Sequence, residues 1–245
     1  MTSKMDRLAR ELKEKATGMG AACFGVADLA PAREFILSYH DDYLEQFPFA
    51  LTAAVPMIDG WVDQLHRQDD ALVMQSYMET LHTIDRRWLS ISYSLTLMLQ
   101  KAGYKALPIA EHAMDKIHRR GLFSHKLAAH LAGLGWIGKN TLLITPEQGP
   151  RVRLMTVLTT APLPVSKPKV ELTYDGCGDC RACVDVCPVQ ALTGIPFAVG
   201  ISRDARLDFH KCLDYRIEQE KRFGARTCAL CLRACPFGDS GKRLK

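Results

Sequence analysis

Eight of the nine cysteines in this 245-residue chain lie in two short runs near its C-terminus. The first run reads Cys177-Gly-Asp-Cys180-Arg-Ala-Cys183-Val-Asp-Val-Cys187-Pro188, which is the pattern C-x2-C-x2-C-x3-C-P. The second opens with Cys212 and continues as Cys228-Ala-Leu-Cys231-Leu-Arg-Ala-Cys235-Pro236. Thiols at this density and spacing are typical of metal centres or disulfide frameworks. No other feature constrains the chemistry of the chain as strongly.

The first run has the spacing of bacterial two-cluster ferredoxins, in which the fourth cysteine of one run binds the other cluster. Three thiolates two residues apart wrap one 4Fe–4S cubane, and the three-residue gap starts a helical turn that directs the fourth sulfur toward the second cluster. Eight thiolates are the number that two such clusters need, so the pattern predicts an electron-transfer centre. We predict a first cysteine group of Cys177, Cys180, Cys183 and Cys235, and a second cysteine group of Cys187, Cys212, Cys228 and Cys231.

Two other uses of the cysteines are less consistent with the pattern. Pairs of the form Cys-x2-Cys also bind structural zinc, but zinc sites do not usually need the interlocked run that ends in Cys-Pro. Disulfides need an oxidising compartment, and residues Met1 to Arg7 show no signal peptide, so we expect a cytoplasmic protein. The ninth cysteine, Cys23, lies in the apolar run Ala21–Ala27 and is expected to pack in a core.

Outside the cysteine runs, helices and strands are expected to alternate. The insertion of 15 residues between Cys212 and Cys228 leaves room for a helix over Tyr215–Arg222. Helices are also expected over Asp6–Gly18, Asp69–Gly103 and Ser124–Leu131, and strands over Ala21–Ala27, Tyr104–Ile109 and Arg151–Thr160. The pattern predicts an α/β (mixed α+β) N-terminal domain over residues 1–168 and a C-terminal two-cluster ferredoxin-like module over residues 169–245. No apolar segment approaches the ~20 residues of a membrane span, so no membrane partner is expected.

Positive charge gathers in the middle of the chain. The formal net charge is +5, and the segment Lys101–Arg153 holds nine Lys and Arg against three Asp and Glu. Such an excess favours an anionic ligand or nucleic acid, and it is equally typical of a solvated face.

The same region contains the glycine-rich segment Gly133-Leu-Gly-Trp-Ile-Gly-Lys-Asn-Thr141. Glycines permit positive φ angles and a close approach of the backbone to a ligand, while Lys139 adds a charge and Trp136 a flat face. The segment follows a predicted helix, so it is not a dinucleotide fingerprint, and it lacks the P-loop pattern. From these residues alone it is either a ligand-binding loop or a tight turn.

In its wider form, Ala132-Gly-Leu-Gly-Trp-Ile-Gly-Lys-Asn-Thr-Leu-Leu143 resembles a signature of the epoxyqueuosine reductase family. Pro146-Glu-Gln-Gly-Pro-Arg151, Leu158–Leu163 and both cysteine runs continue the resemblance, which is most specific from Ser124 to Pro236. Members of this family and the related reductive dehalogenases hold a cobalamin between an α/β domain and a two-cluster ferredoxin module, and the clusters reduce its cobalt. The resemblance therefore implies two 4Fe–4S clusters, a cobalamin, and a divergent short member of the family. It implies a corrinoid pocket lined by Ser124, His125, Lys126, Gly133, Leu134, Gly135, Trp136, Ile137, Gly138, Lys139, Asn140 and Thr141.

The chain departs from the family pattern at the expected proton donor. Family members carry an acidic residue shortly before the glycine-rich segment, whereas the stretch His118–His125 contains no Asp or Glu. His125 and His118 are candidates because imidazoles titrate near neutral pH, although each is also typical of a surface or packing histidine. Asp115 is a third candidate, further upstream. The chain also ends soon after the second cysteine run, so we expect a substrate other than queuosine-modified tRNA.

Two functions of different classes remain open. The first is a corrinoid-dependent reductase that acts on a small-molecule or tRNA-borne substrate and draws electrons from a low-potential donor such as ferredoxin or flavodoxin. The alternative is an electron-transfer protein or corrinoid reductant without substrate chemistry of its own.

Overall fold

The computed structural model of the chain describes residues 3–38, 42–110, 113–115, 119–167 and 174–239. The chain forms two compact units that alternate along the sequence. Unit 1 comprises residues 1–55, 86–135 and 153–172, and unit 2 comprises residues 56–85, 136–152 and 173–245. The domain boundary expected at residue 168 therefore corresponds only to the last crossing between the units. Two earlier segments belong with the cysteine-rich unit, because their contacts are made there rather than with their neighbours in sequence.

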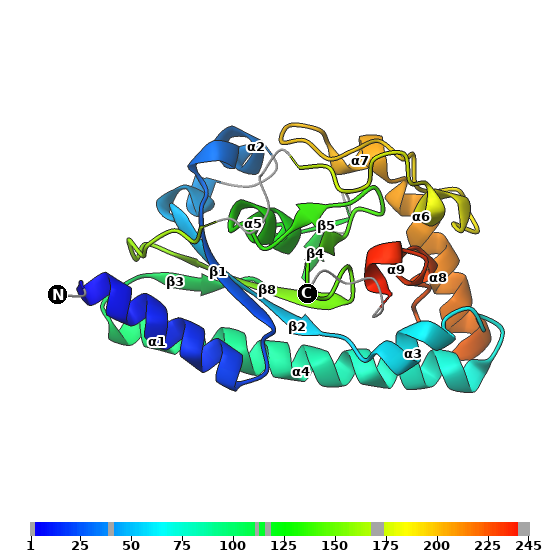
Figure 1. Ribbon diagram of the computed structural model, residues 1–245, viewed down its shortest axis with the longest axis horizontal. Coiled ribbons are helices and arrows are strands. Elements are labelled where there is room, and N and C mark those ends of the chain that lie inside the picture. The colour runs from blue at the N-terminus through cyan, green and yellow to red at the C-terminus, as the bar shows by residue number, and fades with distance from the viewer. Residues whose placement is uncertain (1–2, 39–41, 111–112, 116–118, 168–173, 240–245) are drawn as a thin grey trace. The chain divides into compact units, whose positions relative to one another are not determined.

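Unit 1 is built on a four-stranded sheet with the strand order β1-β2-β8-β3 (Figure 1). The strands are β1 (Cys23–Asp28), β2 (Phe49–Pro56), β8 (Val152–Thr159) and β3 (Ala106–Pro108). β1 runs antiparallel to β2, with Cys23 opposite Ala54, and β3 runs antiparallel to β8, with Ala106 opposite Thr159. β2 is buried at every residue except its two ends, which is typical of a strand covered on both faces.

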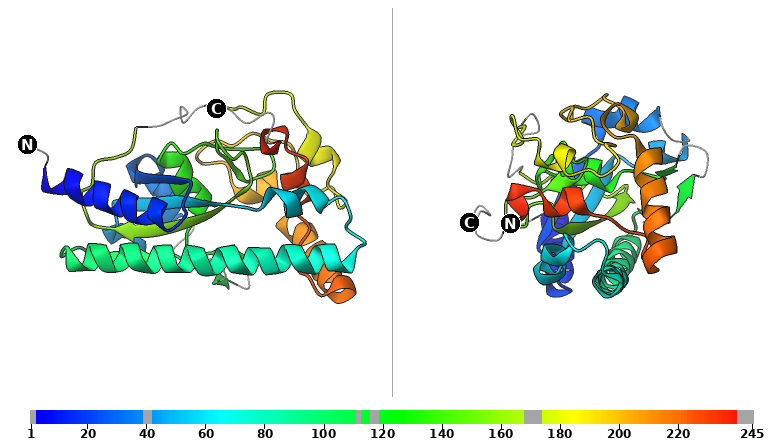
Figure 2. Two further views of the ribbon diagram at one scale, coloured as in Figure 1. Left: turned by 60° about the horizontal axis from the view of Figure 1, so that its bottom comes forward. Right: turned by 90° about the vertical axis from the view of Figure 1, so that its right-hand side faces the viewer.

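Helices cover both faces of this sheet. Figures 1 and 2 show α1 (Lys4–Gly18) and the later part of α4 (Ala71–Lys101) on one face and α5 (His125–Leu131) on the other. The α1 helix begins at a capping box formed by Ser3 and Asp6, and it buries Leu8, Leu12 and Ala16. Helix α4 buries Trp88, Ile91, Leu95 and Leu99, which recur at helical spacing. Full burial of one such apolar side chain contributes about 1.5–3 kcal/mol, so this apolar stripe fixes the helix to the sheet.

Smaller elements complete unit 1. A short 3-10 helix η1 (Ala30–Ala32) leads into α2 (Arg33–Leu37), and η2 (Asp42–Gln46) precedes β2. The two-residue strands β4 (Met114–Asp115) and β5 (Arg120–Gly121) form an antiparallel pair before α5. Cys23 is buried in β1, in the other unit from the eight remaining cysteines.

Unit 2 consists of short helices and loops around the cysteine runs. It contains α3 (Asp59–Gln64), the antiparallel pair β6 (Trp136–Ile137) and β7 (Leu143–Ile144), α7 (Arg203–Arg206) and α8 (Phe209–Phe223). Two four-residue helices, α6 (Ala182–Asp185) and α9 (Leu230–Arg233), pack against each other, and η3 (Pro236–Gly238) follows the last cysteine (Figure 1). Each of α6 and α9 fills the three-residue gap before a Cys-Pro pair. The helical turn predicted for these gaps is confirmed.

The expected fold class is confirmed, with a mixed α/β region followed by a double-cluster domain. The helices predicted over Asp6–Gly18, Asp69–Gly103 and Ser124–Leu131 and the three predicted strands are present, with ends that differ by up to two residues. The helix predicted in the long insertion, α8, is longer than expected and carries Cys212 on its first turn. It begins at the Asp208 N-cap and ends at Gly224, whose φ of 73° is left-handed. None of the described helices is long and apolar enough to cross a membrane.

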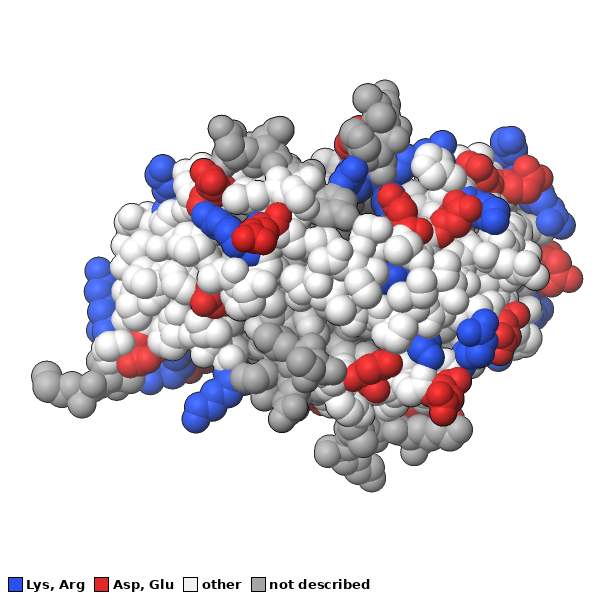
Figure 3. Space-filling view, turned by 90° about the horizontal axis from the view of Figure 1, so that it is seen from above, with Lys and Arg blue, Asp and Glu red and all other residues white. Residues whose placement is uncertain are grey.

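The positive excess of Lys101–Arg153 does not form one surface. Lys139 and Arg151, which belong to this excess, are buried in unit 2, at 8% and 4% exposure. On the face drawn in Figure 3, Lys and Arg side chains alternate with Asp and Glu side chains.

Candidate metal centre

The first cysteine group surrounds one cavity in unit 2. Cys177, Cys180, Cys183 and Cys235 all line it, and its volume is about 290 Å³, partly open to solvent. The remaining lining residues are Lys139, Asn140, Ile144, Pro236 and Phe237. The four thiols that the spacing assigns to one cluster are thus gathered at one place. Two polar side chains from the glycine-rich segment complete the wall.

Local hydrogen bonds shape the loop that supplies three of these cysteines. The Asp175 carboxylate accepts the N–H of Cys177 at 3.0 Å, and the N–H of Cys180 donates to the carbonyl of Cys177 at 2.9 Å. Gly178 has a φ of 45°, a left-handed angle that glycine adopts without strain. Helix α6 starts just after Cys180 and carries Cys183 in its only turn. The sequence therefore turns tightly enough to direct three sulfurs at one cavity.

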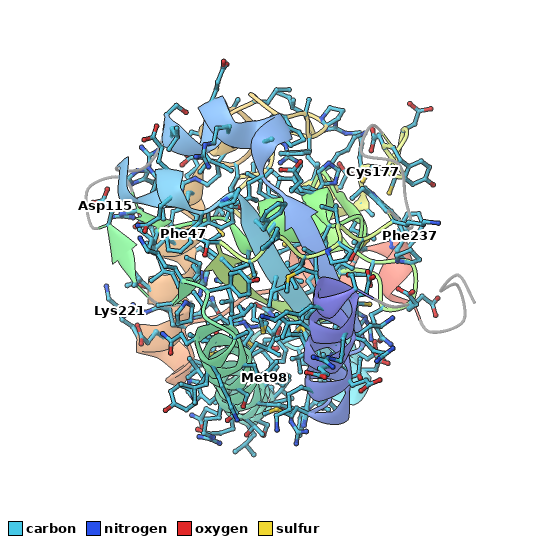
Figure 4. The ribbon with its side chains drawn as sticks, turned by 90° about the vertical axis from the view of Figure 1, so that its left-hand side faces the viewer. Phe47, Met98, Asp115, Cys177, Lys221 and Phe237 are labelled. Carbon is cyan, nitrogen blue, oxygen red and sulfur yellow. The ribbon has the colours of Figure 1, made fainter. Side chains whose placement is uncertain are left out.

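The fourth sulfur is supplied by the Cys235-Pro236 segment, which belongs to the second cysteine run. Gly149, from the Pro146–Arg151 stretch, has a φ of 56°, and a Cβ there would overlap the carbonyl oxygen of Phe237. Reciprocal backbone hydrogen bonds of 2.9 and 2.8 Å between Thr145 and Gly149 hold this tight turn in place. Figure 4 labels Cys177 and Phe237, one from each end of the cavity lining. Glycine is thus required for the close approach of two backbones next to a ligand.

Arg151 holds the turn at residues 145–149 in place through ion pairs. Its guanidinium is buried and bonds to Asp59 at 2.8 Å and to Asp63 at 2.7 Å, both on α3. Burial acts to lower the pKa of Arg151, but the hydrogen bonds and charges of Asp63 and Asp59 outweigh burial and raise this pKa above its usual value. A Cβ at Gly238 would come within 2.9 Å of Arg151 Nε, so η3 packs directly on the ion pair.

The second half of the glycine-rich segment forms part of the cavity wall. The backbone N–H of Lys139 donates to Cys177 Sγ at 3.5 Å, and its ammonium donates to the carbonyl of Gly178 and to that of Cys180, at 3.4 Å from the latter. Arg206 on α7 donates from Nη2 to the carbonyl of Gly138 at 2.7 Å. Trp136 is buried, and its ring meets the edges of Tyr174 and Phe237. These contacts tie the segment to the first cysteine group.

The first half of the glycine-rich segment belongs to unit 1. Gly133 ends helix α5 with a φ of 69°. The carbonyl of Gly135 lies 3.1 Å from Nδ1 of the buried His130. The segment expected to line one corrinoid pocket thus divides between the two units at residues 135 and 136.

The second cysteine group lies around a small apolar core of unit 2. Cys187, Cys212 and Cys231 pack against buried Ala191, Leu192 and Leu207, and Cys183 is part of the same core. The N–H of Ala191 donates to Cys187 Sγ at 3.3 Å. Gln68 donates from Nε2 to the carbonyl of Cys228 at 3.1 Å, which ties residue 228 to the 56–85 segment.

Electrostatic interactions divide the thiols in the same way as the spacing does. Burial raises the pKa of Cys235 to about 12, and the charges of Cys177, Cys183 and Cys180 contribute to this shift. Burial also raises the pKa of Cys228 to about 11 and that of Cys231 to about 12. Cys212 and Cys187 contribute to the raised pKa of Cys228. The raised pKa of Cys231 has contributions from Cys228, Cys212, Cys183 and Cys187. Only the Cys231–Cys183 interaction joins the two groups. Thiols buried in this way hold their protons until a metal displaces them.

The residues fit two iron–sulfur clusters. Each group offers four thiols, and backbone N–H groups donate to a sulfur in each, which is one of the contacts that set cluster potentials. Among the described residues, no three His, Cys, Asp or Glu side chains are arranged to hold a single metal ion. Four thiols around one cavity suit a cluster instead, because its iron atoms are spread over several corners.

The candidate proton donors fall in three different situations. His118 lies outside the described residues. Asp115, on β4, is exposed and points outward (Figure 4). His125 is half-buried, with Nδ1 2.9 Å from Thr156 Oγ1 and its ring edge-on to Trp88, so it packs within unit 1. Of the other predicted pocket residues, Ser124 caps α5 through the N–H of Leu127, and Lys126 is half-buried on that helix.

Sequence reasoning did not identify Arg206, Gly149 or Ile144 as part of this centre. Gly149 lies in a segment that the family resemblance includes, so that resemblance was the available signal. Arg206 follows the Ser202 N-cap in a short helix, and nothing in the surrounding residues distinguishes it from a surface arginine.

Comparisons with known proteins agree with this centre. Residues 176–238 match the family described as a 4Fe-4S double cluster binding domain. An epoxyqueuosine reductase from Bacillus cereus is 34% identical over 126 residues, which cover 47% of this chain and 30% of the relative. An epoxyqueuosine reductase from Pseudomonas aeruginosa is 28% identical over 228 residues, which cover 85% of this chain and 60% of the relative. The chain is therefore similar to the epoxyqueuosine reductases.

Solved structures relate the fold of this reductase-like chain to two groups of enzymes. The catabolic reductive dehalogenase NpRdhA, in complex with 3-bromo-4-hydroxybenzoic acid, superimposes with a TM-score of 0.68 and 22% identity over 97% of this chain and 33% of its own. Epoxyqueuosine reductase from Bacillus subtilis superimposes with a TM-score of 0.61 and 19% identity over 99% of this chain and 68% of its own. At these identities the likeness establishes the fold alone.

The reductase-like chain spans only part of the curated proteins that it resembles. The first of these relatives are matched over 30–34% of their own length. The relatives' activity, substrates and partners are therefore carried over only as proposals.

Proposed function

We propose that the chain is a corrinoid-dependent iron–sulfur reductase. In this proposal the first and second cysteine groups each hold a 4Fe–4S cluster, and a cobalamin lies against the glycine-rich segment Gly133–Thr141. The single observation that carries the proposal is the cavity in which Lys139 and Asn140 of that segment share a wall with the four thiols of the first cysteine group. The segment that we propose lines the corrinoid thereby lies beside a predicted electron carrier.

The residues of the chain have distinct parts in this proposal. The eight thiols would lose their protons on binding iron and hold the clusters, while the N–H groups of Lys139 and Ala191 donate to Sγ of Cys177 and Cys187. Gly149 and Arg151 hold the Cys235 segment against the cavity. When bound, the clusters supply single low-potential electrons and the corrinoid supplies the cobalt centre at which a substrate is reduced.

The substrate and the electron donor extend the proposal further. A solved epoxyqueuosine reductase is in complex with an epoxyqueuosine-modified tRNA stem loop, which supports a tRNA-borne substrate as one alternative to a small molecule. We propose a low-potential ferredoxin or flavodoxin as the electron donor.

A second function, electron transfer to a partner without substrate chemistry, is favoured by one observation. Of the candidate proton donors that the structure describes, Asp115 is exposed on a two-residue strand and His125 packs between Thr156 and Trp88. Neither arrangement resembles a proton donor held in a pocket. If the chain transfers electrons only, it needs no such donor.

Titration with cobalamin distinguishes the two functions. The chain is reconstituted anaerobically with iron and sulfide to about eight irons, and cobalamin binding is followed by visible absorption and EPR. The proposal predicts tight binding with base-off cobalt signals. Weak or absent binding at full iron content would favour the electron carrier.

A substitution in the proposed pocket tests the assignment of the glycine-rich segment. Gly135→Val adds a branched side chain of three carbons at a buried position of this segment, so cobalamin binding is expected to fall while the iron content stays unchanged. If the variant binds cobalamin as tightly as the unsubstituted chain, the pocket lies elsewhere.

A further inference from the structure

Two buried cations lie beside the first cysteine group. Lys139 is 8% exposed and lines the cavity, and Arg206 is 4% exposed. The Lys139 ammonium donates to the carbonyls of Gly178 and Cys180 in the cysteine loop. Arg206 donates to the carbonyl of Gly138, immediately before Lys139, and from Nε to that of Ile195 at 3.3 Å. Both cations are therefore held in place by backbone groups around the cavity.

Neither cation forms an ion pair with a carboxylate within the part of the chain that the structure describes. Arg151 provides the contrast, because this equally buried guanidinium is neutralised by Asp59 and Asp63. Burying a charge is costly unless an opposite charge is close by. Burial lowers the pKa of Arg206, and the opposing charges that act to raise this pKa are those of a Cys177 thiolate and Asp175, both in the segment of the first cysteine group. The arrangement therefore suits an anion in the cavity.

We propose that Lys139 and Arg206 are charge-tuning residues that stabilise the reduced form of the cluster held by the first cysteine group and make it the stronger electron acceptor of the two clusters. This inference rests on the proposed function, because it requires both clusters. A cluster bound by four thiolates is an anion, and reduction adds a further negative charge. Fixed cations that are shielded from water favour that added charge.

The second cysteine group is less well supplied with positive charge. Its cationic neighbour is Arg216, which acts on Cys212 and Cys228. Arg216 is only half-buried, and its guanidinium donates to the carbonyl of Arg226. Solvent screens such a charge more than it screens Lys139 or Arg206. An electron that enters the chain is thus expected to settle at the first cysteine group, beside the glycine-rich segment.

Redox titration of the reconstituted full chain, followed by EPR, tests the proposal. Lys139→Gln and Arg206→Gln each remove a charge but keep a hydrogen-bond donor. At a fixed potential, each is expected to lower the reduced-to-oxidised ratio of one cluster about tenfold, a shift of about 59 mV for a one-electron couple. Lys139→Arg and Arg206→Lys keep the charge and should restore the original ratio. Lys221→Gln removes an exposed cation of the same unit and should leave both clusters unchanged.

Iron content separates failure of this inference from failure of the proposed function. A chain that assembles no clusters contradicts the proposed function. Clusters that assemble fully in Lys139→Gln and Arg206→Gln, with ratios unchanged at every potential, overturn the charge-tuning role.

A second measurement applies even if the glutamine variants lose iron. Cys212→Ala is expected to keep only the cluster of the first cysteine group. Its midpoint potential must match the higher of the two potentials of the unsubstituted chain. If it matches the lower one, the proposal is wrong.

Discussion

The substitution Gly149→Ala tests how closely the Cys235 segment depends on its support. Gly149 has a φ of 56°, and a Cβ there would overlap the carbonyl oxygen of Phe237 and lie 2.8 Å from the N of Gly238. Both neighbours are backbone atoms, so no side-chain rotation relieves the overlap. The segment that carries Cys235 has to move away from the cavity, or the turn at residues 145–149 has to open.

Gly149→Ala is expected to lower the free energy of unfolding in two ways. A left-handed angle at a residue other than glycine costs about 1–2 kcal/mol. Overpacking against a rigid neighbour adds about 1–3 kcal/mol. The free energy of unfolding is therefore expected to fall by about 2–5 kcal/mol in total. The displacement also moves a cluster ligand, because Cys235 lies two residues before Phe237.

Gly200→Ala is the matched control. Gly200 lies in the same unit with a φ of 96°, but nothing lies within 4 Å of a Cβ built there. This variant carries the cost of the left-handed angle without the overlap. After anaerobic reconstitution, Gly149→Ala is expected to hold about four irons per chain and Gly200→Ala about eight. Equal iron content and equal stability of the two variants would refute the close approach as a requirement of the cluster site.

Three further changes test other parts of the structure. Cys187 lies in the first run, but Cys187→Ala should remove the cluster of the second cysteine group. The EPR signal that remains should match that of Cys212→Ala. A match with the signal of Cys180→Ala instead would reverse the predicted assignment of Cys187. Trp88→Phe removes the indole N–H that donates to the buried carbonyl of Leu154 and should destabilise unit 1 by about 1–3 kcal/mol in a denaturant titration. A cost no greater than that of Leu89→Ala, at an exposed position of the same helix, would contradict this. Arg151→Met leaves Asp59 and Asp63 without their cation and should cost about 1–3 kcal/mol, less than a fully buried pair because both carboxylates are partly exposed; an unchanged denaturation midpoint would show that the ion pair contributes nothing.

Local patterns in the sequence predicted what depends on local physics. The spacing of Leu8, Leu12 and Ala16 predicted α1, and that of Trp88, Ile91, Leu95 and Leu99 predicted α4, because an amphipathic helix carries its buried face in its own residues. The cysteine spacing predicted the two short helices before the Cys-Pro pairs for the same reason.

Other features depend on contacts between distant segments. β2 was not predicted, because Phe49–Pro56 is an apolar run, broken only by Thr52, without the alternation of a half-buried strand. The assignment of residues 56–85 and 136–152 to the cysteine-rich unit also follows from partners far away in sequence, such as Gln68 with Cys228.

The glycine-rich segment combines features that depend on local packing with features that depend on distant segments. Gly138 is required by local packing, since a Cβ there would come within 2.5 Å of the Ile144 side chain, whereas the expected approach of the backbone to a ligand stays a prediction. The glycines did not indicate which partner the segment approaches. The structure places Lys139 and Asn140 at the first cysteine group, whereas the role of the whole segment in holding a corrinoid stays a prediction.

The central claim is that electrons pass from the clusters to a corrinoid on this chain. The direct measurement reduces the reconstituted protein anaerobically, removes excess reductant, adds one equivalent of cobalamin, and follows the cluster EPR signals and the cobalt absorption in the same sample. The account predicts that the cluster signals fall as the cobalt is reduced, and that Cys180→Ala slows or abolishes this transfer. Clusters that stay reduced beside a bound, unreduced corrinoid would contradict it.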